Sequence, residues 1–224
     1  VLRDPNAEAD DLIARWIALH PTDEHVIISS DSDFYQLITD KVTQFNGITD
    51  NLITLEGIYD AKGKQVIDKK TKEPKLLGDP EWLLFEKCMR GDSSDNVFSA
   101  YPGVRKKGTK NKVGLLEAFE DRKSKGYAWN NMMLQRWTDH NGAEHRVLDD
   151  YNRNKELIDL TAMPDEIKDR VDLAIIEQLT NKDVGQVGSK FLKFCGKYEL
   201  TRLSDNAEQY GRWLNQTYQG ALKQ

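Results

Sequence analysis

The fold class follows most directly from residues 26–34, which read Val-Ile-Ile-Ser-Ser-Asp-Ser-Asp-Phe. A short, wholly apolar run followed by two serines is typical of a buried parallel strand. Apolar residues at helical spacing precede it over residues 7–19, and Pro21 ends that helix. A second helix is expected from about Phe34 to Ile38. A helix, a strand and a helix in succession predict an α/β fold with a parallel sheet.

Beyond this unit the pattern changes from strands to helices. Short strands are expected within residues 42–70, and Asp79-Pro80-Glu81 predicts the start of a helix that runs to about Met89. We therefore divide the chain into an α/β part, residues 1–100, and a helical part, residues 101–224. Further helices are expected over residues 112–121, 127–137, 144–161, 165–179, 184–195 and 206–219.

Composition narrows the class of protein. The chain has 224 residues, of which 38% are hydrophobic and 9% aromatic, and this content is too rich for a disordered chain. It contains no run of 18 apolar residues, so no transmembrane helix is expected. Cys88 and Cys195 are too few and too distant for a disulfide framework or a zinc cluster. We expect a cytoplasmic protein in a reducing compartment.

Charge is unevenly distributed along the chain, although the net charge is only −5. Residues 1–40 hold nine acids and two bases, whereas residues 101–125 hold eight bases and three acids. This pattern suits an enzyme that holds cations in one place and a polyanion in another. Two solvated faces would give the same pattern, so charge alone leaves both interpretations open.

Three acidic clusters are candidate metal ligands. Residues 8–11 (Glu-Ala-Asp-Asp) begin a helix, residues 31–33 (Asp-Ser-Asp) follow the apolar strand, and residues 91–96 (Gly-Asp-Ser-Ser-Asp-Asn) end a helix. Helix capping or turn formation would explain each cluster alone. If the fold brings them together, each pair of carboxylates about 4 Å apart costs about 4 kcal/mol at an effective dielectric of about 20. Oxygen-only ligands then predict two Mg²⁺ ions, or Mn²⁺, and cleavage of phosphodiesters.

A basic turn follows the third acidic cluster. Five of the eight residues 105–112 are basic, and Gly103 and Gly108 permit a close backbone approach. Backbone N–H groups, the start of a helix and basic side chains together suit a phosphate backbone. The contact would be non-specific and sensitive to salt, because charge carries it. A solvated loop without a ligand is the alternative.

Taken in this order, the motifs resemble those of the 5′-nuclease family, which includes flap endonucleases, the 5′-nuclease domain of bacterial DNA polymerase I and phage 5′→3′ exonucleases. Residues 8–11, 30–34 and 91–96 are similar to the metal-binding motifs of that family, and residues 102–117 to its helix–three-turn–helix DNA clamp. The longer, more basic clamp and residues 151–167 resemble the ribonuclease H of T4-like phages. The resemblance implies the remainder of a PIN-like parallel-sheet core, followed by a helical DNA-binding region.

The resemblance also implies roles for individual residues. Asp31 and Asp33, with Glu8 and Asp10, would hold the ion on the catalytic side. Asp92 and Asp95 would hold or orient the second ion, and Asp11 would support the ligands. A K⁺ ion is implied at the clamp turn. The residues implied to contact DNA are Gly103, Arg105, Lys106, Lys107, Gly108, Lys110 and Lys112.

The implied activity is that of a Mg²⁺-dependent 5′→3′ exonuclease and flap endonuclease, with RNase H-like removal of RNA primers during phage DNA replication. Its substrates would be branched or nicked duplex DNA and RNA–DNA hybrids, and a single-strand DNA-binding protein would be a further partner. We expect a monomer without a membrane partner, in the cytoplasm of the host if the gene belongs to a phage.

The chain departs from the family pattern at its beginning. In the family an Asp-bearing strand, another Asp and a basic helical arch precede the Glu-Ala-Asp-Asp motif, whereas seven residues precede Glu8 here. We therefore expect an N-terminally truncated chain with exposed apolar surface. Two alternatives stay open. One is a duplex-binding fragment without a working site, and the other is a haloacid-dehalogenase-type phosphatase in which Asp31 is the nucleophile.

Overall fold

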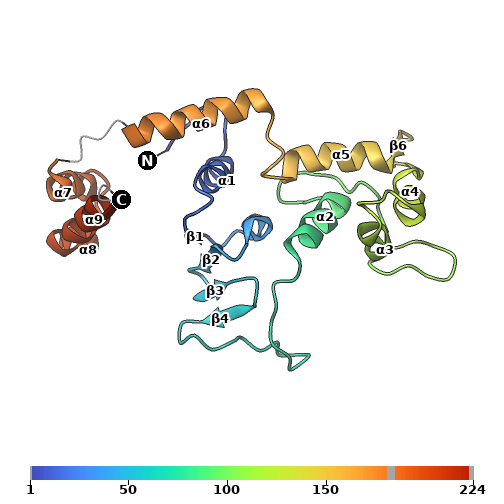
Figure 1. Ribbon diagram of the computed structural model, residues 1–224, viewed down its shortest axis with the longest axis horizontal. Helices are drawn as coiled ribbons and strands as arrows, with labels where there is room; N and C mark the ends of the chain where they lie inside the picture. Colours follow the sequence, from blue (N-terminus) through green and yellow to red (C-terminus); the bar gives the residue numbers. More distant parts are fainter. Residues whose placement is uncertain (1, 181–184, 222–224) are drawn as a thin grey trace. The chain divides into compact units, whose positions relative to one another are not determined.

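The computed structural model describes residues 2–180 and 185–221 (Figure 1). Internal contacts divide the chain into two units, residues 1–175 and residues 176–224, which are described separately. The boundary expected near residue 100 falls inside the first unit, and the division into parts 1–100 and 101–224 stays a prediction. In the part of the chain that the structure describes, no helix has the length and apolar character needed to cross a membrane.

The first unit contains a four-stranded sheet in the order β1-β2-β3-β4 (Figure 1). The strands are β1 (His25–Ile28), β2 (Val42–Asn46), β3 (Asn51–Ile53) and β4 (Ile58–Asp60). β1 pairs with β2 in parallel, with Ile27 opposite Gln44, and the other two pairs are antiparallel. A mixed α/β fold whose sheet contains a parallel pair confirms the predicted fold class.

The prediction that residues 26–28 form a buried strand is wrong in one respect. The run does form a parallel strand, but Val26 is 61% exposed and Ile28 is 80% exposed, and only Ile27 is buried. Among the described residues β1 is an edge strand, and one of its faces is covered. Two of its apolar side chains are therefore exposed on the other face.

One core packs helices against the covered face of β1. Helix α1 (Ala9–Leu19) contributes Ala14, and the 3₁₀ helix η1 (Ser32–Leu37) contributes Phe34 and Leu37. The short helix expected from Phe34 is therefore a tighter one that starts two residues earlier. It starts there because the carboxylate of Asp31 accepts the backbone N–H of Asp33 at 2.9 Å and caps it.

A second, larger core joins the helices that follow the sheet. They are α2 (Pro80–Arg90), α3 (Leu115–Glu120), α4 (Tyr127–Met133) and α5 (Val147–Ile158). Helix α2 begins where the sequence predicts, with Pro80 in its first turn and Asp79 accepting the N–H of Glu81 at 2.9 Å. The core includes Phe85, Met89, Leu115, Met132 and Val147.

The helices expected over residues 127–137 and 144–161 are shortened by a hairpin. β5 (Arg136–Thr138) pairs with β6 (Glu144–Arg146) in antiparallel fashion. The turn between them has Gly142 at a φ of +85°. Asp139 accepts the N–H groups of Asn141 at 2.9 Å and Ala143 at 2.8 Å. A side chain that binds the backbone in this way favours a turn over a helix.

Helix α6 (Asp165–Thr180) begins in the first unit. Arg170 binds both carboxylate oxygens of Asp4 at 3.0 Å, and Arg15 of α1 binds those of Asp172 at 2.7 and 2.6 Å. Such paired, charge-assisted hydrogen bonds fix direction as well as distance. They attach the start of the chain and α1 to α6.

The second unit is helical. It contains α7 (Val187–Lys197), α8 (Thr201–Ser204) and α9 (Ala207–Ala221). Phe191 of α7 packs against Tyr210 of α9 with ring centroids 6.0 Å apart. The two helices also approach closely at their glycines, since a Cβ added to Gly211 would lie 3.0 Å from the Cα of Gly188. The sequence predicts α7 and α9 but not the single turn of α8.

Candidate metal centre and nucleic-acid interface

Three of the predicted acidic residues meet at one place. One carboxylate oxygen from each of Asp33, Asp92 and Asp95 lies within 4.8 Å of the others, and no second such group occurs among the described residues. Ligands on opposite sides of a Mg²⁺ ion lie about 4.2 Å apart, because each bond is about 2.1 Å long. The three oxygens therefore fit a single hard cation. A helix cap and a turn alone would not require them to converge.

Lys87, in the last turn of α2, lies between these carboxylates. Its ammonium group contacts Asp33 and forms an ion pair with Asp92 at 2.6 Å. Sequence reasoning missed this residue. The signal available was a lysine in the last helical turn before the acidic cluster of residues 91–96. Lys87 compensates charge where three carboxylates would otherwise repel one another.

These contacts shift the protonation equilibria of the site. Hydrogen bonds from Lys87, and then from Ser94, hold the pKa of Asp92 well below its usual range. Partial desolvation and the charges of Asp92 and Asp33 raise the pKa of Asp95. Burial disfavours the charge on Lys87, but hydrogen bonds to Asp33 and Asp92 outweigh it and raise its pKa. The site is thus a strongly coupled set of charges.

Local hydrogen bonds position the Asp31 and Asp33 segment. The buried side chain of Gln44 on β2 donates to the carbonyl oxygens of Ser29 at 2.8 Å and Asp31 at 2.7 Å. Gln36 donates to the carbonyl oxygen of Asp33 at 2.9 Å. The side chain of Asp31 is engaged in capping η1 and lies outside the group of three.

A tight turn positions Asp92 and Asp95. Asp92 and Val97 exchange two backbone hydrogen bonds of 2.8 Å, so the residues between them form a closed loop. Gly91 enters this loop with a φ of +74°, and a Cβ there would lie 2.3 Å from the carbonyl oxygen of Val97. Only glycine fits at this position, because it adopts a positive φ without strain and has no Cβ to collide with Val97.

The first acidic cluster does not join this group of three carboxylates. Glu8 and Asp10 stand at the start of α1, and neither belongs to the group formed by Asp33, Asp92 and Asp95. Asp11 accepts the backbone N–H of Glu8 at 3.0 Å as part of a helix cap, and its predicted role in supporting metal ligands stays a prediction. The structure thus brings together the second and third clusters.

The predicted clamp forms a closed turn before α3. The carboxylate of Glu117 accepts the N–H groups of Gly108 at 3.0 Å and Gly114 at 3.1 Å. A Cβ on Gly108 would lie 2.3 Å from the carbonyl oxygen of Lys112. The pKa of Glu117 is lowered by hydrogen bonds from backbone N–H groups. The largest effect comes from its own N–H group, followed by those of Gly108 and Gly114. The glycines are therefore needed for close backbone packing.

The basic side chains of this turn face solvent. Arg105, Lys106, Lys107, Lys110 and Lys112 are all exposed, and Gly103 has a φ of +78°. A pocket of about 520 Å³ lies in the turn, lined by residues that include Gly103, Arg105, Lys107, Gly108 and Lys112. Exposed cations around a concave backbone suit a phosphate ligand.

Comparison with known proteins adds a sequence relative. The chain is 35% identical over 122 residues to a 5′-3′ exonuclease of Buchnera aphidicola subsp. Schizaphis graminum. The match covers 52% of this chain and 35% of the relative, so the chain spans about a third of that protein's length. No protein-family model matches the chain.

Solved structures give weaker similarities. A mutant of the T5 5′-exonuclease has a TM-score of 0.44 at 22% identity, covering 76% of this chain and 65% of that one. A bacteriophage T5 flap endonuclease in a pseudo-enzyme-product complex with DNA and metal ions has a TM-score of 0.44 at 21% identity, covering 76% and 59%. These scores are too low to establish a shared fold. What these comparisons show is sequence similarity between about half of this chain and a 5′-3′ exonuclease.

Proposed function

We propose that the chain belongs to a metal-dependent 5′→3′ exonuclease and flap endonuclease. The observation that carries the proposal is the convergence of Asp33 with Asp92 and Asp95. In the sequence, Asp33 precedes strands β2 to β4, and the other two residues follow them. The 5′-3′ exonuclease relative supports this chemistry over that of a haloacid-dehalogenase-type phosphatase.

The donor set fits Mg²⁺ or Mn²⁺, since all three ligand atoms are carboxylate oxygens. In the proposed site two ions bind, with Glu8, Asp10 and Asp31 as further ligands. Such ions stabilise the charge that develops during phosphodiester hydrolysis. The chain's own contribution is to hold the carboxylates close together, and Lys87 balances their charge.

The basic turn is the proposed duplex-binding surface. Arg105, Lys106, Lys107, Lys110 and Lys112 would contact the phosphate backbone, with Gly103 and Gly108 allowing a close approach, and K⁺ is proposed at the same turn. The proposed substrates are branched or nicked duplex DNA and RNA–DNA hybrids, consistent with removal of RNA primers during phage DNA replication. A single-strand DNA-binding protein as partner, a monomeric state and a location in the host cytoplasm complete the proposal.

The proposal is tested by incubating the chain with 5′-flap DNA and RNA–DNA hybrids in Mg²⁺. We expect cleavage that EDTA abolishes and that the paired substitution Asp31→Asn/Asp33→Asn removes. An Asp40→Asn variant is the matched control, since Asp40 is exposed and outside the acidic group. Normal cleavage by the Asp31/Asp33 variant would overturn the assignment.

One observation favours a second candidate, a duplex-binding fragment that does not cleave. Glu8 and Asp10 lie outside the acidic group, and Lys87 already compensates two of its three carboxylates. This candidate predicts salt-dependent binding of duplex DNA without cleavage at any Mg²⁺ concentration. The flap assay above separates the two candidates.

A further inference from the structure

Two buried side-chain amides hold the two acidic segments in the same way. Gln44 and Asn154 are both 0% exposed. Each uses one NH₂ group to donate to two backbone carbonyl oxygens that belong to an acidic segment or flank it. For Gln44 these are the carbonyl oxygens of Ser29 and Asp31, at 2.8 and 2.7 Å.

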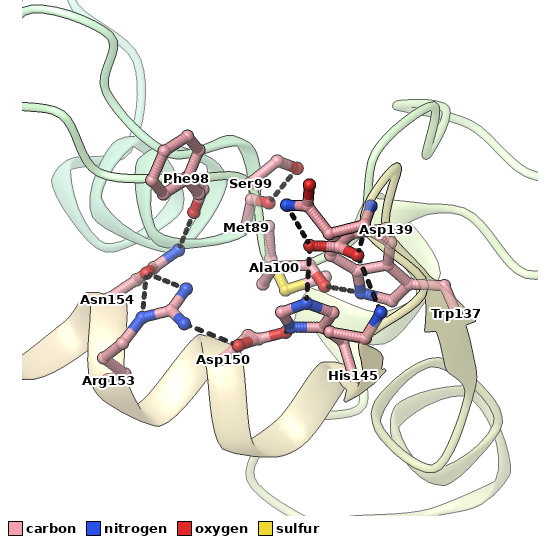
Figure 2. Close-up of polar contacts among 12 residues, drawn as sticks. Met89, Phe98, Ser99, Ala100, Trp137, Asp139, His145, Asp150, Arg153 and Asn154 are labelled. Carbon is pink, nitrogen blue, oxygen red and sulfur yellow. Dashed lines mark hydrogen bonds and ion pairs between the residues drawn. The ribbon is translucent and has the colours of Figure 1, made fainter.

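Asn154 of α5 bridges the two ends of the loop that carries Asp92 and Asp95. It donates to the carbonyl oxygen of Cys88 at 2.8 Å and to that of Phe98 at 2.7 Å. Figure 2 shows its contact with Phe98. The carbonyl of Cys88 lies in the last turn of α2, where helical partners run out. The N–H of Asp92, which would bind this carbonyl if the helix continued, donates to the carbonyl oxygen of Val97. Asn154 therefore supplies the missing hydrogen bond to Cys88 where the helix ends.

The orientation of Asn154 is itself fixed. Its oxygen accepts a hydrogen bond of 3.0 Å from Arg153, whose guanidinium group also binds Asp150 at 2.7 Å (Figure 2). Asp150 in turn contacts Nδ1 of His145 at 3.0 Å. These contacts leave the NH₂ group of Asn154 directed at the two carbonyl oxygens.

Helix α5 also reaches the other acidic segment. The carbonyl oxygen of Ile158, at its end, accepts a hydrogen bond of 3.0 Å from Gln36, and the N–H of Leu160 donates to Gln36 at 2.9 Å. Gln36 donates to the carbonyl oxygen of Asp33 as well. One helix is therefore bonded to both segments whose carboxylates converge.

From this arrangement we propose that Asn154 and Gln44 are positioning residues of the metal centre. They set the spacing between Asp33 and the pair Asp92 and Asp95 without touching an ion. The inference rests on the proposed metal centre, not on cleavage. Residues that orient ligands in this way typically change metal affinity about 10- to 100-fold when they are replaced.

The test uses Mn²⁺ binding, followed by electron paramagnetic resonance, and hydrogen exchange of single backbone amides. We expect Asn154→Leu and Gln44→Met each to weaken Mn²⁺ binding by about tenfold or more. Asn154→Leu should accelerate exchange at Asp92 and Val97, whereas Gln44→Met should accelerate it at Asp31 and Asp33. If Asn154→Leu does not fold, Asn154→Asp carries the test, because it keeps the size and loses both donors.

The control is Ile58→Ala, which opens a cavity beside Ile53 and Leu77 but removes no hydrogen bond of Gln44 or Asn154. It should lower the melting temperature but leave Mn²⁺ affinity and the local exchange pattern unchanged. The inference is overturned if Asn154→Leu and Gln44→Met bind Mn²⁺ as the wild type does, or if Ile58→Ala loses as much affinity as they do.

Failure of the proposed function gives a different result. A wild-type chain that binds Mn²⁺ but leaves flap DNA intact defeats the nuclease and leaves the positioning role standing. If the wild type binds no Mn²⁺, the metal centre fails, and the exchange pattern alone decides whether the amides hold the two segments.

Discussion

Lys87 is the residue that most changes how the acidic site is understood. Carboxylates at Asp33 and Asp92 follow from the motifs of the sequence, because their spacing and neighbours are local. Lys87 does not follow, because its proximity to Asp33 depends on how α2 packs against η1. A residue near a site can thus be predicted when it belongs to a sequence motif. It is missed when only tertiary packing brings it to the site.

Replacing Lys87 by Met should separate charge compensation from metal binding. Without the ammonium group, the carboxylates of Asp33 and Asp92 repel each other, so we expect the free energy of unfolding in EDTA to fall by about 2 kcal/mol. Mn²⁺ should bind more tightly and restore the stability, because the ion no longer competes with Lys87. Urea unfolding with and without Mn²⁺ measures both effects, with Lys64→Met as an exposed control. Weaker Mn²⁺ binding by Lys87→Met would show that Lys87 assists the ion.

The depressed pKa of Asp92 predicts how stability depends on pH. Lys87 lowers this pKa in the folded state, so the ion pair contributes fully above the unfolded value of 3.8. That contribution is lost as the pH falls through the lower folded value. Urea unfolding from about pH 5 to about pH 2 should therefore show a steeper loss of stability for the wild type than for Lys87→Met. Parallel curves would contradict the assigned cause.

At the scale of elements, boundaries set by local chemistry are predictable. Helix α2 begins where Asp79 and Pro80 indicate, because a cap and a proline act on the residues beside them. The hairpin of β5 and β6 is not predicted, since Trp137 and His145 have no strong strand pattern and pair through a stack of their rings at 4.4 Å. The contact between these two rings forms only in the folded hairpin, so no local sequence pattern predicts it.

The basic turn makes a prediction that salt dependence can measure. If Lys107 and Lys110 contact phosphates, the double substitution Lys107→Ala/Lys110→Ala should lower duplex affinity and reduce the slope of log K against log salt by about 1.8. Fluorescence anisotropy with a labelled duplex at several salt concentrations gives the slope. Lys69→Ala/Lys70→Ala removes two exposed lysines from a loop of the sheet and should leave the slope unchanged. Equal slopes for wild type and the first variant would exclude this turn from the interface.

At the scale of the whole chain, β1 leaves apolar side chains exposed, with Val26 at 61% and Ile28 at 80%. A pocket of about 520 Å³ there is lined by apolar residues of α1 and β1, among them Leu12, Trp16 and Ile28. The apolar composition of residues 26–28 is visible in the sequence, but the exposure of Val26 and Ile28 depends on what covers their face of the strand. The expected exposure of apolar surface is thus found at β1.

This surface should govern association of the chain in solution. Ile28→Lys places a charge on the edge strand where the side chain is already 80% exposed. We expect less aggregation at high concentration, with a change in the free energy of unfolding of no more than about 0.5 kcal/mol. Light scattering and urea unfolding measure the two quantities. Aggregation that is unchanged in Ile28→Lys but relieved by a change elsewhere would assign the association to another surface.

The most direct test of the central claim is Mn²⁺ binding to the wild type, Asp33→Asn, Asp92→Asn and the control Asp40→Asn, measured by calorimetry. A shared metal centre predicts that the wild type and Asp40→Asn bind equally, whereas Asp33→Asn and Asp92→Asn each lose at least about tenfold in affinity. Equal binding by all four proteins would show that the carboxylates of residues 33 and 92 do not hold a common ion.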